Sequence, residues 1–329
     1  MKNLNIILLS VLLIFVSKSY GQDYHFTQFD VAEQALNPAK TGVGTNSAFR
    51  GVTQYRNQWR PLATKPFSTF LLSYDMPISD RFGVGAYMVN NDGAKAFNAF
   101  NFVLSGSYKI MDPKQKKHLL TTGLQIGVLY KKTSDFDLLF DNQYNSGKFS
   151  AELESNENLT KFSKTMPEFN FGAYYEWTDK ANIYHPYAGI SIFHLSSPKE
   201  SLIESADNSQ LPRRFVFNGG SKFNITDEID VNLKSLYMYQ GNAKELVIGL
   251  SGKYKFTENN MEAILGSNWR KDDAVSILVG VKYQDLTFLI SYDITTSQLN
   301  EFNNSNGGIE FTLVYSPSGK SSFGSSRFR

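Results

Sequence analysis

The sequence contains no cysteine among its 329 residues. That absence excludes disulfide bonds, thiol chemistry, Cys-based metal sites and the lipidated cysteine of a lipoprotein. Neither sign of charge is in large excess, since the chain has 33 Lys and Arg and 31 Asp and Glu. A nucleic-acid partner therefore loses its simplest electrostatic support. After Val16 no stretch approaches about eighteen apolar residues, so we expect no membrane-spanning helix.

The one long apolar run lies at the N-terminus. Lys2 precedes Ile6–Val16, and Ser19 and Gly21 supply small residues before a cleavage site. A run of about eleven residues is too short to span a bilayer, so residues 1–21 are predicted to be an export signal. Its removal takes away two basic residues and no acid, which leaves 31 of each sign.

Aromatic residues are the clearest excess, with 18 Tyr, 26 Phe and 3 Trp, or 14% of the chain. A soluble core does not need so many tyrosines. An apolar ring with a polar tip suits a lipid–water boundary, where transmembrane barrels carry aromatic girdles.

Apolar and polar residues alternate along most of the chain. In Leu246–Phe256, Leu246, Ile248 and Leu250 share one face, whereas Val247, Gly249 and Ser251 share the other. This period of two predicts β-strands. We expect about fourteen, at Ala48–Tyr55, Thr69–Met76, Phe82–Asn90, Asn98–Ile110, His118–Lys131, Glu168–Trp177, Tyr184–Leu195, Arg213–Phe223, Asp230–Gln240, Lys244–Phe256, Met261–Arg270, Ala274–Tyr283, Leu286–Asp293 and Gly307–Tyr315.

These strands favour an all-β fold, a transmembrane antiparallel barrel. Many are long enough to cross a bilayer when tilted. A soluble β-sandwich also alternates, but the second face here is Gly, Ser, Thr, Asn, Lys and Gln. The connections Asn90–Phe97 and Lys255–Asn260 are short, whereas Thr133–Thr165 and Ser196–Pro212 are long and polar. Short turns at one end and long loops at the other are typical of bacterial barrels, with Thr133–Thr165 as the longest outside loop.

Five motifs follow one another in the first seventy residues after the signal. They are Gln22-Asp23-Tyr24-His25-Phe26-Thr27-Gln28-Phe29, Leu36-Asn37-Pro38-Ala39, Tyr55-Arg56-Asn57-Gln58-Trp59, Lys65-Pro66-Phe67-Ser68-Thr69 and Ser73-Tyr74-Asp75, after which Phe82-Gly83-Val84-Gly85 opens a strand. Their order resembles the PorP/SprF family of type IX secretion membrane proteins of Bacteroidetes. The resemblance is sharp over 22–90 and afterwards rests on strand rhythm and length.

The resemblance implies a non-enzymatic outer-membrane role in type IX secretion. It implies outer-membrane lipid, secretion components and a large secreted surface protein, such as a gliding-motility adhesin, as partners. The organisation we expect is a signal peptide at 1–21, a plug or periplasmic segment at 22–47, a barrel at 48–316 and a tail at 317–329. The candidate motif or partner residues are Phe26, Gln28, Phe29, Asn37, Pro38, Arg56, Gln58 and Trp59.

Residues 22–45 do not alternate like a strand, and we expect them to form a plug. Asn37-Pro38 favours a turn, because proline fixes its own φ and restricts the residue before it. Gln28 and Gln34 are expected to hydrogen-bond to lumen-facing side chains such as Asn101, Gln125 and Lys253. At the end of the first strand, we favour Arg56 as a rim cation and Trp59 as a girdle aromatic over direct partner contacts.

The sequence contains no motif that indicates a catalytic or cofactor site. The four histidines, His25, His118, His185 and His194, lack zinc-ligand spacing, and His118 and His194 are expected at solvated rims. Asp135, Asp137 and Asp141 offer oxygen ligands, but the loop lacks the features of a calcium-binding EF-hand. No nucleophile elbow, phosphate-binding loop or zinc-protease motif occurs. We therefore expect no enzyme activity, no cofactor and no metal.

The alternative is a FadL-like channel for hydrophobic compounds, which resembles a fourteen-stranded barrel with an N-terminal hatch. The Arg56–Trp59 motif fits the secretion family better, and the chain is short for a FadL-like member. Uptake of fatty acids by a knockout strain separates the two.

The barrel itself is testable by fractionation. We expect the mature chain in the outer-membrane fraction, migrating faster on gels before boiling than after, because a closed barrel resists detergent until heated. Recovery in the soluble periplasm would contradict the barrel.

Overall fold

The computed structural model describes residues 23–43, 47–59, 66–93, 97–111, 117–133, 144–145, 148–149, 163–179, 181–200 and 209–319. The predicted export signal and most of the Thr133–Thr165 loop, including its three aspartates, lie outside these ranges.

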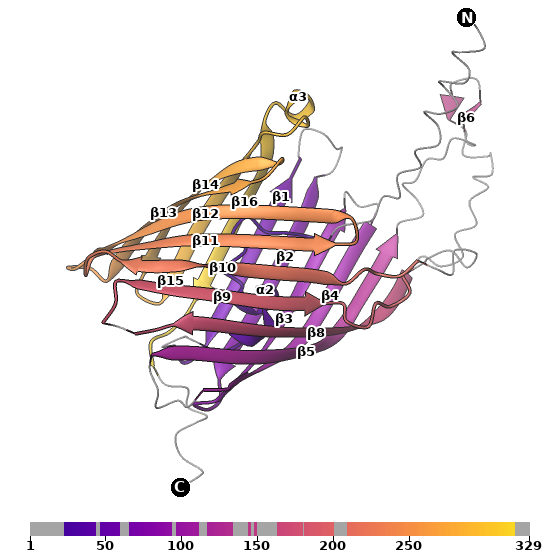
Figure 1. Cartoon of the computed structure of the whole chain (residues 1–329). Helices are drawn as coiled ribbons and strands as arrows, with labels where there is room; N and C mark the ends of the chain where they lie inside the picture. Colours follow the sequence, from indigo (N-terminus) through magenta and orange to yellow (C-terminus); the bar gives the residue numbers. More distant parts are fainter. Residues whose placement is uncertain are drawn as a thin grey trace, which may run out of the picture.

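Fourteen strands form one closed antiparallel barrel, in which each strand pairs with its neighbours in sequence and β1 closes on β16 (Figure 1). The predicted barrel is confirmed, and each predicted strand corresponds to an observed one. They are β1 (Arg50–Gln58), β2 (Phe67–Pro77), β3 (Phe82–Gly93), β4 (Phe97–Lys109), β5 (His118–Thr133), β8 (Ser163–Trp177), β9 (Tyr184–Phe193), β10 (Arg214–Asn224), β11 (Ile229–Gln240), β12 (Ala243–Phe256), β13 (Met261–Arg270), β14 (Ala274–Tyr283), β15 (Leu286–Thr295) and β16 (Asn306–Tyr315). A separate pair, β6 (Tyr144–Asn145) and β7 (Lys148–Phe149), lies in the connection from β5 to β8.

The alternation of the sequence becomes the two faces of the wall. In β12, Ile248 and Leu250 face outward with 43% and 54% exposure, whereas Val247 faces inward with 3%. Outward aliphatic residues occupy the middle of the wall, for example Leu104, Ile126, Leu250, Leu265 and Val279. Outward aromatic residues gather near the two ends, at Tyr55, Phe67, Phe97, Tyr237, Trp269 and Tyr292 on one side and Tyr74, Phe82, Tyr175, Tyr184, Tyr254, Phe256, Tyr283 and Tyr315 on the other. This is the band between two girdles that a barrel in a bilayer needs.

The two ends of the barrel differ in their connections. The end that carries the β5–β8, β9–β10 and β15–β16 connections has the long ones, and the opposite end has short turns. Long loops face outside the cell and short turns face the periplasm in such barrels. The start of β1 and the end of β16 meet at the periplasmic end, where Ser47 bridges Ser318. Asn90–Phe97, grouped with the short turns in the sequence, is a tight hairpin at the outer end.

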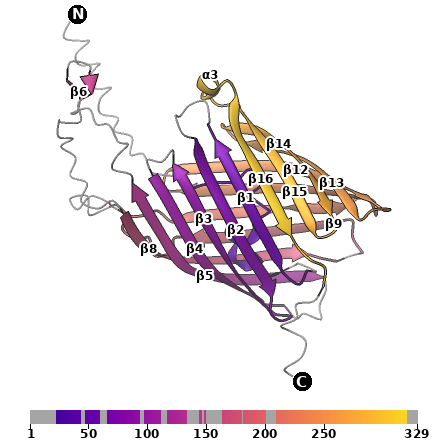
Figure 2. The same ribbon diagram turned by 180° about the vertical axis from the view of Figure 1, so that it is seen from behind.

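Helical turns are few and short. No helix in the described ranges is both long and apolar enough to cross a membrane. The turns α2 (Glu33–Leu36) and η1 (Pro38–Lys40) lie inside the ring of strands (Figures 1 and 2), and α3 (Asn300–Asn303) lies in the connection before β16.

Residues 23–43, hereafter the lumenal segment, pack against the inner wall and form the core of the molecule with it. Phe26 and Ala32 of the segment cluster with the wall residues Val52, Leu71 and Val89. Farther along the segment, a second cluster joins Leu36 to four wall residues, Phe193, Val216, Leu236 and Val247. Burial of apolar surface thus stabilises the segment inside the barrel.

The face assignment predicts the cost of placing a charge in the wall. Ile248→Arg should destabilise the barrel by about 2–4 kcal/mol near the midplane, because the cation faces lipid. Ser251→Arg, inward on the same strand, should cost much less, because its guanidinium can reach water at the periplasmic end of the lumen, where the side chain of Lys253 is exposed. Gly249→Ser is not a neutral control, because an added Cβ would lie 2.1 Å from Asn268 Oδ1. Equilibrium unfolding in lipid vesicles measures the difference, and equal costs would contradict the register.

Candidate functional site

The lumenal segment runs the length of the barrel interior. At its start, the backbone N–H of Asp23 donates to Gln240 Oε1 at the outer end of β11, over 3.0 Å. At its other end, the N–H of Gly42 donates to Asp75 Oδ2 near the periplasmic end of β2, over 2.7 Å. The chain therefore descends from the outer mouth to the periplasmic end before β1 begins.

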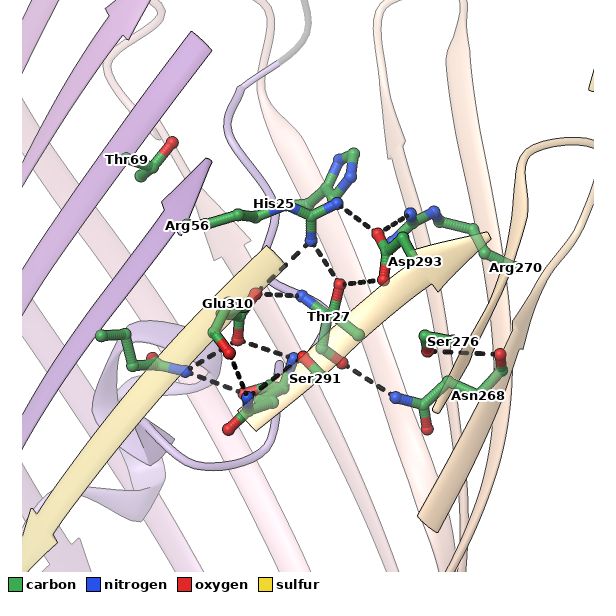
Figure 3. Close-up of polar contacts among 12 residues, drawn as sticks. His25, Thr27, Arg56, Thr69, Asn268, Arg270, Ser276, Ser291, Asp293 and Glu310 are labelled. Carbon is green, nitrogen blue, oxygen red and sulfur yellow. Dashed lines mark hydrogen bonds and ion pairs between the residues drawn. The ribbon is translucent and has the colours of Figure 1, made fainter. Parts of the chain in front are cut away.

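A buried arginine joins the segment to three strands (Figure 3). Arg56 on β1 is 1% exposed and donates over 2.7 Å both to Thr27 Oγ1 and to Asp293 Oδ2 on β15. Arg270 on β13 donates to the same Asp293 oxygen over 2.7 Å, and the Thr27 hydroxyl donates to the other oxygen over 2.7 Å. Glu310 on β16 lies 3.5 Å from the Arg56 guanidinium. Because these groups are shielded from water, removal of one partner leaves a buried charge uncompensated.

The backbone of the segment is held at the same place. Glu310 accepts the N–H of Thr27 over 2.7 Å and that of Gln28 over 3.0 Å. The side chain of Asn268 donates to Thr27 O over 3.0 Å, and that of Gln28 donates to Ser291 Oγ over 3.1 Å. Side chains of the wall thus supply the hydrogen-bond partners that the backbone of the segment would find in a neighbouring strand if it were part of a sheet.

Wall glycines make room for the Asn-Pro turn. A Cβ on Gly123 would lie 2.3 Å from the Pro38 carbonyl carbon, and one on Gly172 would lie 2.1 Å from Asn37 Oδ1. In this space Asn37 Nδ2 donates to the carbonyls of Ala173 and Ile190, over 3.0 and 3.2 Å. Asn37 Oδ1 accepts the N–H of Ala39 over 2.9 Å, which confirms the expected turn. Any side chain at these glycines would force the turn away from the wall.

Gln34 occupies a comparable position against β2 and β3. Its Nε2 donates to Ser73 Oγ over 2.8 Å and to two wall carbonyls, and Gln125 Nε2 donates to its backbone oxygen over 2.8 Å. A Cβ on Gly85 would lie 2.5 Å from Gln34 Oε1. The expected contacts of Gln28, Gln34 and Gln125 are confirmed. The expected contact from Lys253 is wrong, since that side chain is exposed near the periplasmic end of β12, and the buried Oδ1 of Asn101 has no hydrogen-bond partner.

A second ion-pair group holds the segment near the periplasmic end. Arg50 on β1 binds both oxygens of Asp75 over 3.0 and 2.8 Å and lies 2.6 Å from Glu33 of the segment. Lys40 lies 3.0 Å from the same Glu33 carboxylate. Burial would raise the pKa of Glu33, but the charges on Arg50 and Lys40 lower it to about 2.

His194 fixes the start of the segment at the outer mouth. Its two ring nitrogens lie 2.6 Å from Asp23 Oδ2 and 2.7 Å from Glu168 Oε2, and Arg214 lies 3.4 Å from Asp23. Burial would lower the pKa of His194, but the carboxylates of Asp23 and Glu168 raise it to about 9. The expectation of a solvated rim position is wrong for His194, which is 3% exposed. His118 is half-buried at the periplasmic start of β5, where it contacts the Tyr175 hydroxyl over 2.8 Å.

The predicted site residues fall into three places. Phe26, Gln28 and Phe29 lie on the lumenal segment near Arg56 or the apolar clusters, and Asn37 and Pro38 lie against the wall glycines. Gln58 and Trp59 end β1 at the outer rim. Trp59 packs edge-on against Phe67 with 5.3 Å between ring centroids, as a girdle aromatic would. The interpretation of Arg56 as a rim cation is wrong, because its side chain points into the lumen and is buried.

Sequence reasoning missed the acidic half of the site. Asp293, Glu310 and Glu168 all stand in strands on the inward face and are 2% exposed or less. The sequence does contain a signal for these residues. A carboxylate in mid-strand on the lumen-facing side of a barrel needs a cation within the lumen. Matching Asp293 and Glu310 to Arg56 requires the barrel closure, which pairs β16 with β1 and with β15. Glu168 on β8 meets His194, directly after the neighbouring β9, without that closure.

Small cavities lie between the lumenal segment and the wall. One of about 50 Å³, towards β9–β11, is lined among others by Phe29, Leu36 and Phe193. Another of about 60 Å³, towards β8–β11, is lined among others by Glu33 and Tyr174. Within the described ranges no three His, Asp or Glu side chains are grouped as metal ligands. The arrangement is therefore suited to holding a peptide segment through ion pairs, backbone hydrogen bonds and small apolar contacts.

Comparison with known proteins gives a family and a fold. A family profile described as type IX secretion system membrane protein PorP/SprF matches residues 18–315. The search of curated proteins finds no match. The solved CymD monoaromatic hydrocarbon channel is 12% identical, covers 89% of this chain and 94% of its own, and has a TM-score of 0.52. The toluene transporter TodX of Pseudomonas putida is 8% identical over 88% of this chain and 94% of its own, with a TM-score of 0.52. At such identities the likeness shows the barrel fold alone.

The His194 contacts predict a pH-dependent hold on the segment. Because its pKa is raised from 6.5 to about 9, the stabilisation is complete below pH 6.5 and is lost as the pH rises through about 9. The shift corresponds to roughly 3 kcal/mol. His194→Gln should therefore lower the temperature of heat modification on gels most at acidic pH, and the difference from wild type should close in strongly alkaline buffer. His185→Gln at the periplasmic start of β9 is the control, and a constant difference for His194→Gln would contradict the assignment.

Proposed function

Because the chain belongs to the PorP/SprF family of type IX secretion system membrane proteins, we propose that it supports the export or surface anchoring of a large cell-surface protein. The family and the barrel place the chain in the outer membrane. This family and this barrel fold are typical of secretion or channel proteins, which are generally not enzymes. A gliding-motility adhesin is one partner that fits this role.

The observation that carries the proposal is the segment held inside the lumen. Ion pairs of Arg50 with Glu33 and of His194 with Asp23, and the hydrogen bond from Arg56 to Thr27, tie the lumenal segment to the wall along its length. A barrel closed in this way is better suited to hold a partner at its outer mouth than to conduct it. Residues 22–47 then act as a plug, residues 48–316 as the membrane anchor and residues 317–329 as a tail.

A second candidate is a channel for hydrophobic compounds, favoured by the fold shared with CymD and TodX. The interior cavities of about 50 and 60 Å³ beside the described segment are each smaller than the roughly 150 Å³ that an engineered apolar cavity offers to benzene. Passage of such a compound would require the lumenal segment to move. Fatty-acid uptake that falls in a knockout strain would favour the channel over secretion.

Deletion of most of the lumenal segment tests the proposed role in secretion. A pull-down from detergent-solubilised outer membrane first identifies the bound surface protein. Deletion of Tyr24–Ala39 should then leave the barrel inserted but abolish surface display of that protein, because the outer mouth loses its plug. Protease accessibility on whole cells measures display, and heat-modifiable migration measures insertion.

A pair of glycine variants separates the segment from the barrel. Gly123→Leu should reproduce the deletion, because its side chain would occupy the space of Pro38. Gly106→Leu should have no effect, because an added Cβ there meets nothing within 4 Å. Normal display in the deletion and in Gly123→Leu would remove the segment from the mechanism.

A further inference from the structure

A groove of about 570 Å³ opens on the outer surface of the barrel, at the outer ends of β1, β15 and β16. Its walls include outward-facing aromatic, aliphatic and amide side chains, and none of the lining residues that the structure describes is charged. Chief among them are Tyr55, Asn57, Trp59, Tyr292, Ile309 and Phe311. Its size lies within the roughly 300–1,000 Å³ of small-molecule sites.

Irregular backbone shapes the groove. The pairing of β15 with β16 shifts register between Asp293 and Ile294, opposite the Gly307-Gly308 pair. Both glycines line the groove with backbone atoms. A Cβ on Gly307 would lie 2.8 Å from Asp293 O and 3.0 Å from the buried side chains of Asp293 and Thr295, on the inward side of the wall. Strand irregularities of this kind re-aim side chains next to functional sites.

Trp59 forms one wall in a strained conformation. Its φ is 52°, a left-handed value that is unfavourable for a bulky side chain. The N–H of Trp59 donates to Gly307 O over 2.9 Å, and Phe67 packs edge-on against its ring. Backbone strain persists only where the surroundings enforce it, and it is concentrated at ligand sites.

The polar atoms of the groove lie towards the outer rim. Tyr292 OH donates to Asn306 Oδ1 over 2.7 Å, and Asn57 Nδ2 donates to Tyr55 OH over 3.4 Å. In that second bond the Tyr55 hydroxyl accepts and the Asn57 amide donates, so the Tyr55 proton and the Asn57 side-chain oxygen take no part in it and can face a ligand. Ile309 and Phe311, farther along β16 towards the midplane, continue the groove as apolar surface.

We propose that this groove binds a single glycolipid of the outer leaflet, with an acyl chain against Ile309 and Phe311 and a sugar head group against Tyr55, Asn57 and Tyr292. The groove faces the bilayer at the level of the outer aromatic girdle, so lipid is its surroundings. Hydroxyls and amides suit an uncharged, hydroxyl-rich head group. A phosphate head group would find no cation among the lining residues within the described ranges.

The proposal accounts for both faces of the Arg56-Asn57-Gln58-Trp59 motif. Successive residues of a strand point to opposite sides of the sheet. Arg56 therefore enters the lumenal cluster, whereas Asn57 and Trp59 line the lipid-facing groove.

Native mass spectrometry of the full chain in a neutral detergent tests the site. The probes are monoglucosyl diacylglycerol and phosphatidylglycerol, added separately at equal concentration. The wild type should retain one sugar lipid with a preference of about tenfold over the phospholipid, or roughly 1.4 kcal/mol. Ile309→Trp should fill the groove and lower that occupancy about tenfold.

Ile190→Trp is the matched control, because Ile190 is also a lipid-facing strand residue, on β9, with 50% exposure. It should bind as the wild type does. Heat-modifiable migration shows that each variant is folded, and Tyr292→Phe, which keeps the ring, should lose only the preference for the sugar head. Unchanged occupancy in Ile309→Trp, or equal retention of both lipids by the wild type, would overturn the proposal.

Discussion

Two buried carboxylates, Asp293 and Glu310, set the constraint on which the interior depends. Each stands on the inward face of a strand where solvation is poor, so each requires cations or N–H donors. Arg56 and Arg270 supply the cations, and the backbone of Thr27 and Gln28 supplies the donors. The lumenal segment therefore helps to stabilise the buried charges of the wall, and the wall in turn supplies hydrogen-bond partners to the segment.

The sequence predicted the wall far better than the interior. Alternation over Leu246–Phe256 or Met261–Arg270 is a local property, and the strand bounds and faces follow from it with few errors. The Arg56–Asp293 and His194–Asp23 contacts join residues 237 and 171 positions apart, so no local pattern reports them. The turn at Asn37-Pro38 was predictable because proline restricts the backbone locally, whereas its seat against Gly123 and Gly172 was not.

Glycine has a particular use in this barrel. On the inward face Gly85, Gly123 and Gly172 create depressions into which the lumenal segment fits, and near the outer rim a Cβ on Gly307 would meet the buried side chains of Asp293 and Thr295. The motif Gly83-Val84-Gly85 lies at the start of a strand, where it cannot form a nucleotide-binding loop. Packing against the lumenal segment explains its glycines. A Cβ on Gly83 would lie 2.1 Å from Thr41 O.

The descent of the lumenal segment from the outer mouth has a consequence for assembly. The lumenal segment lies inside the ring, and the next strand of the chain, β1, belongs to that ring. The ring closes between β1 and β16, and these two strands carry Arg56 and Glu310. Docking of the segment and closure of the ring therefore stabilise each other, since the segment's partners are complete only in the closed barrel. Loss of the segment would remove this support but would leave the backbone pairing of β1 with β16 intact.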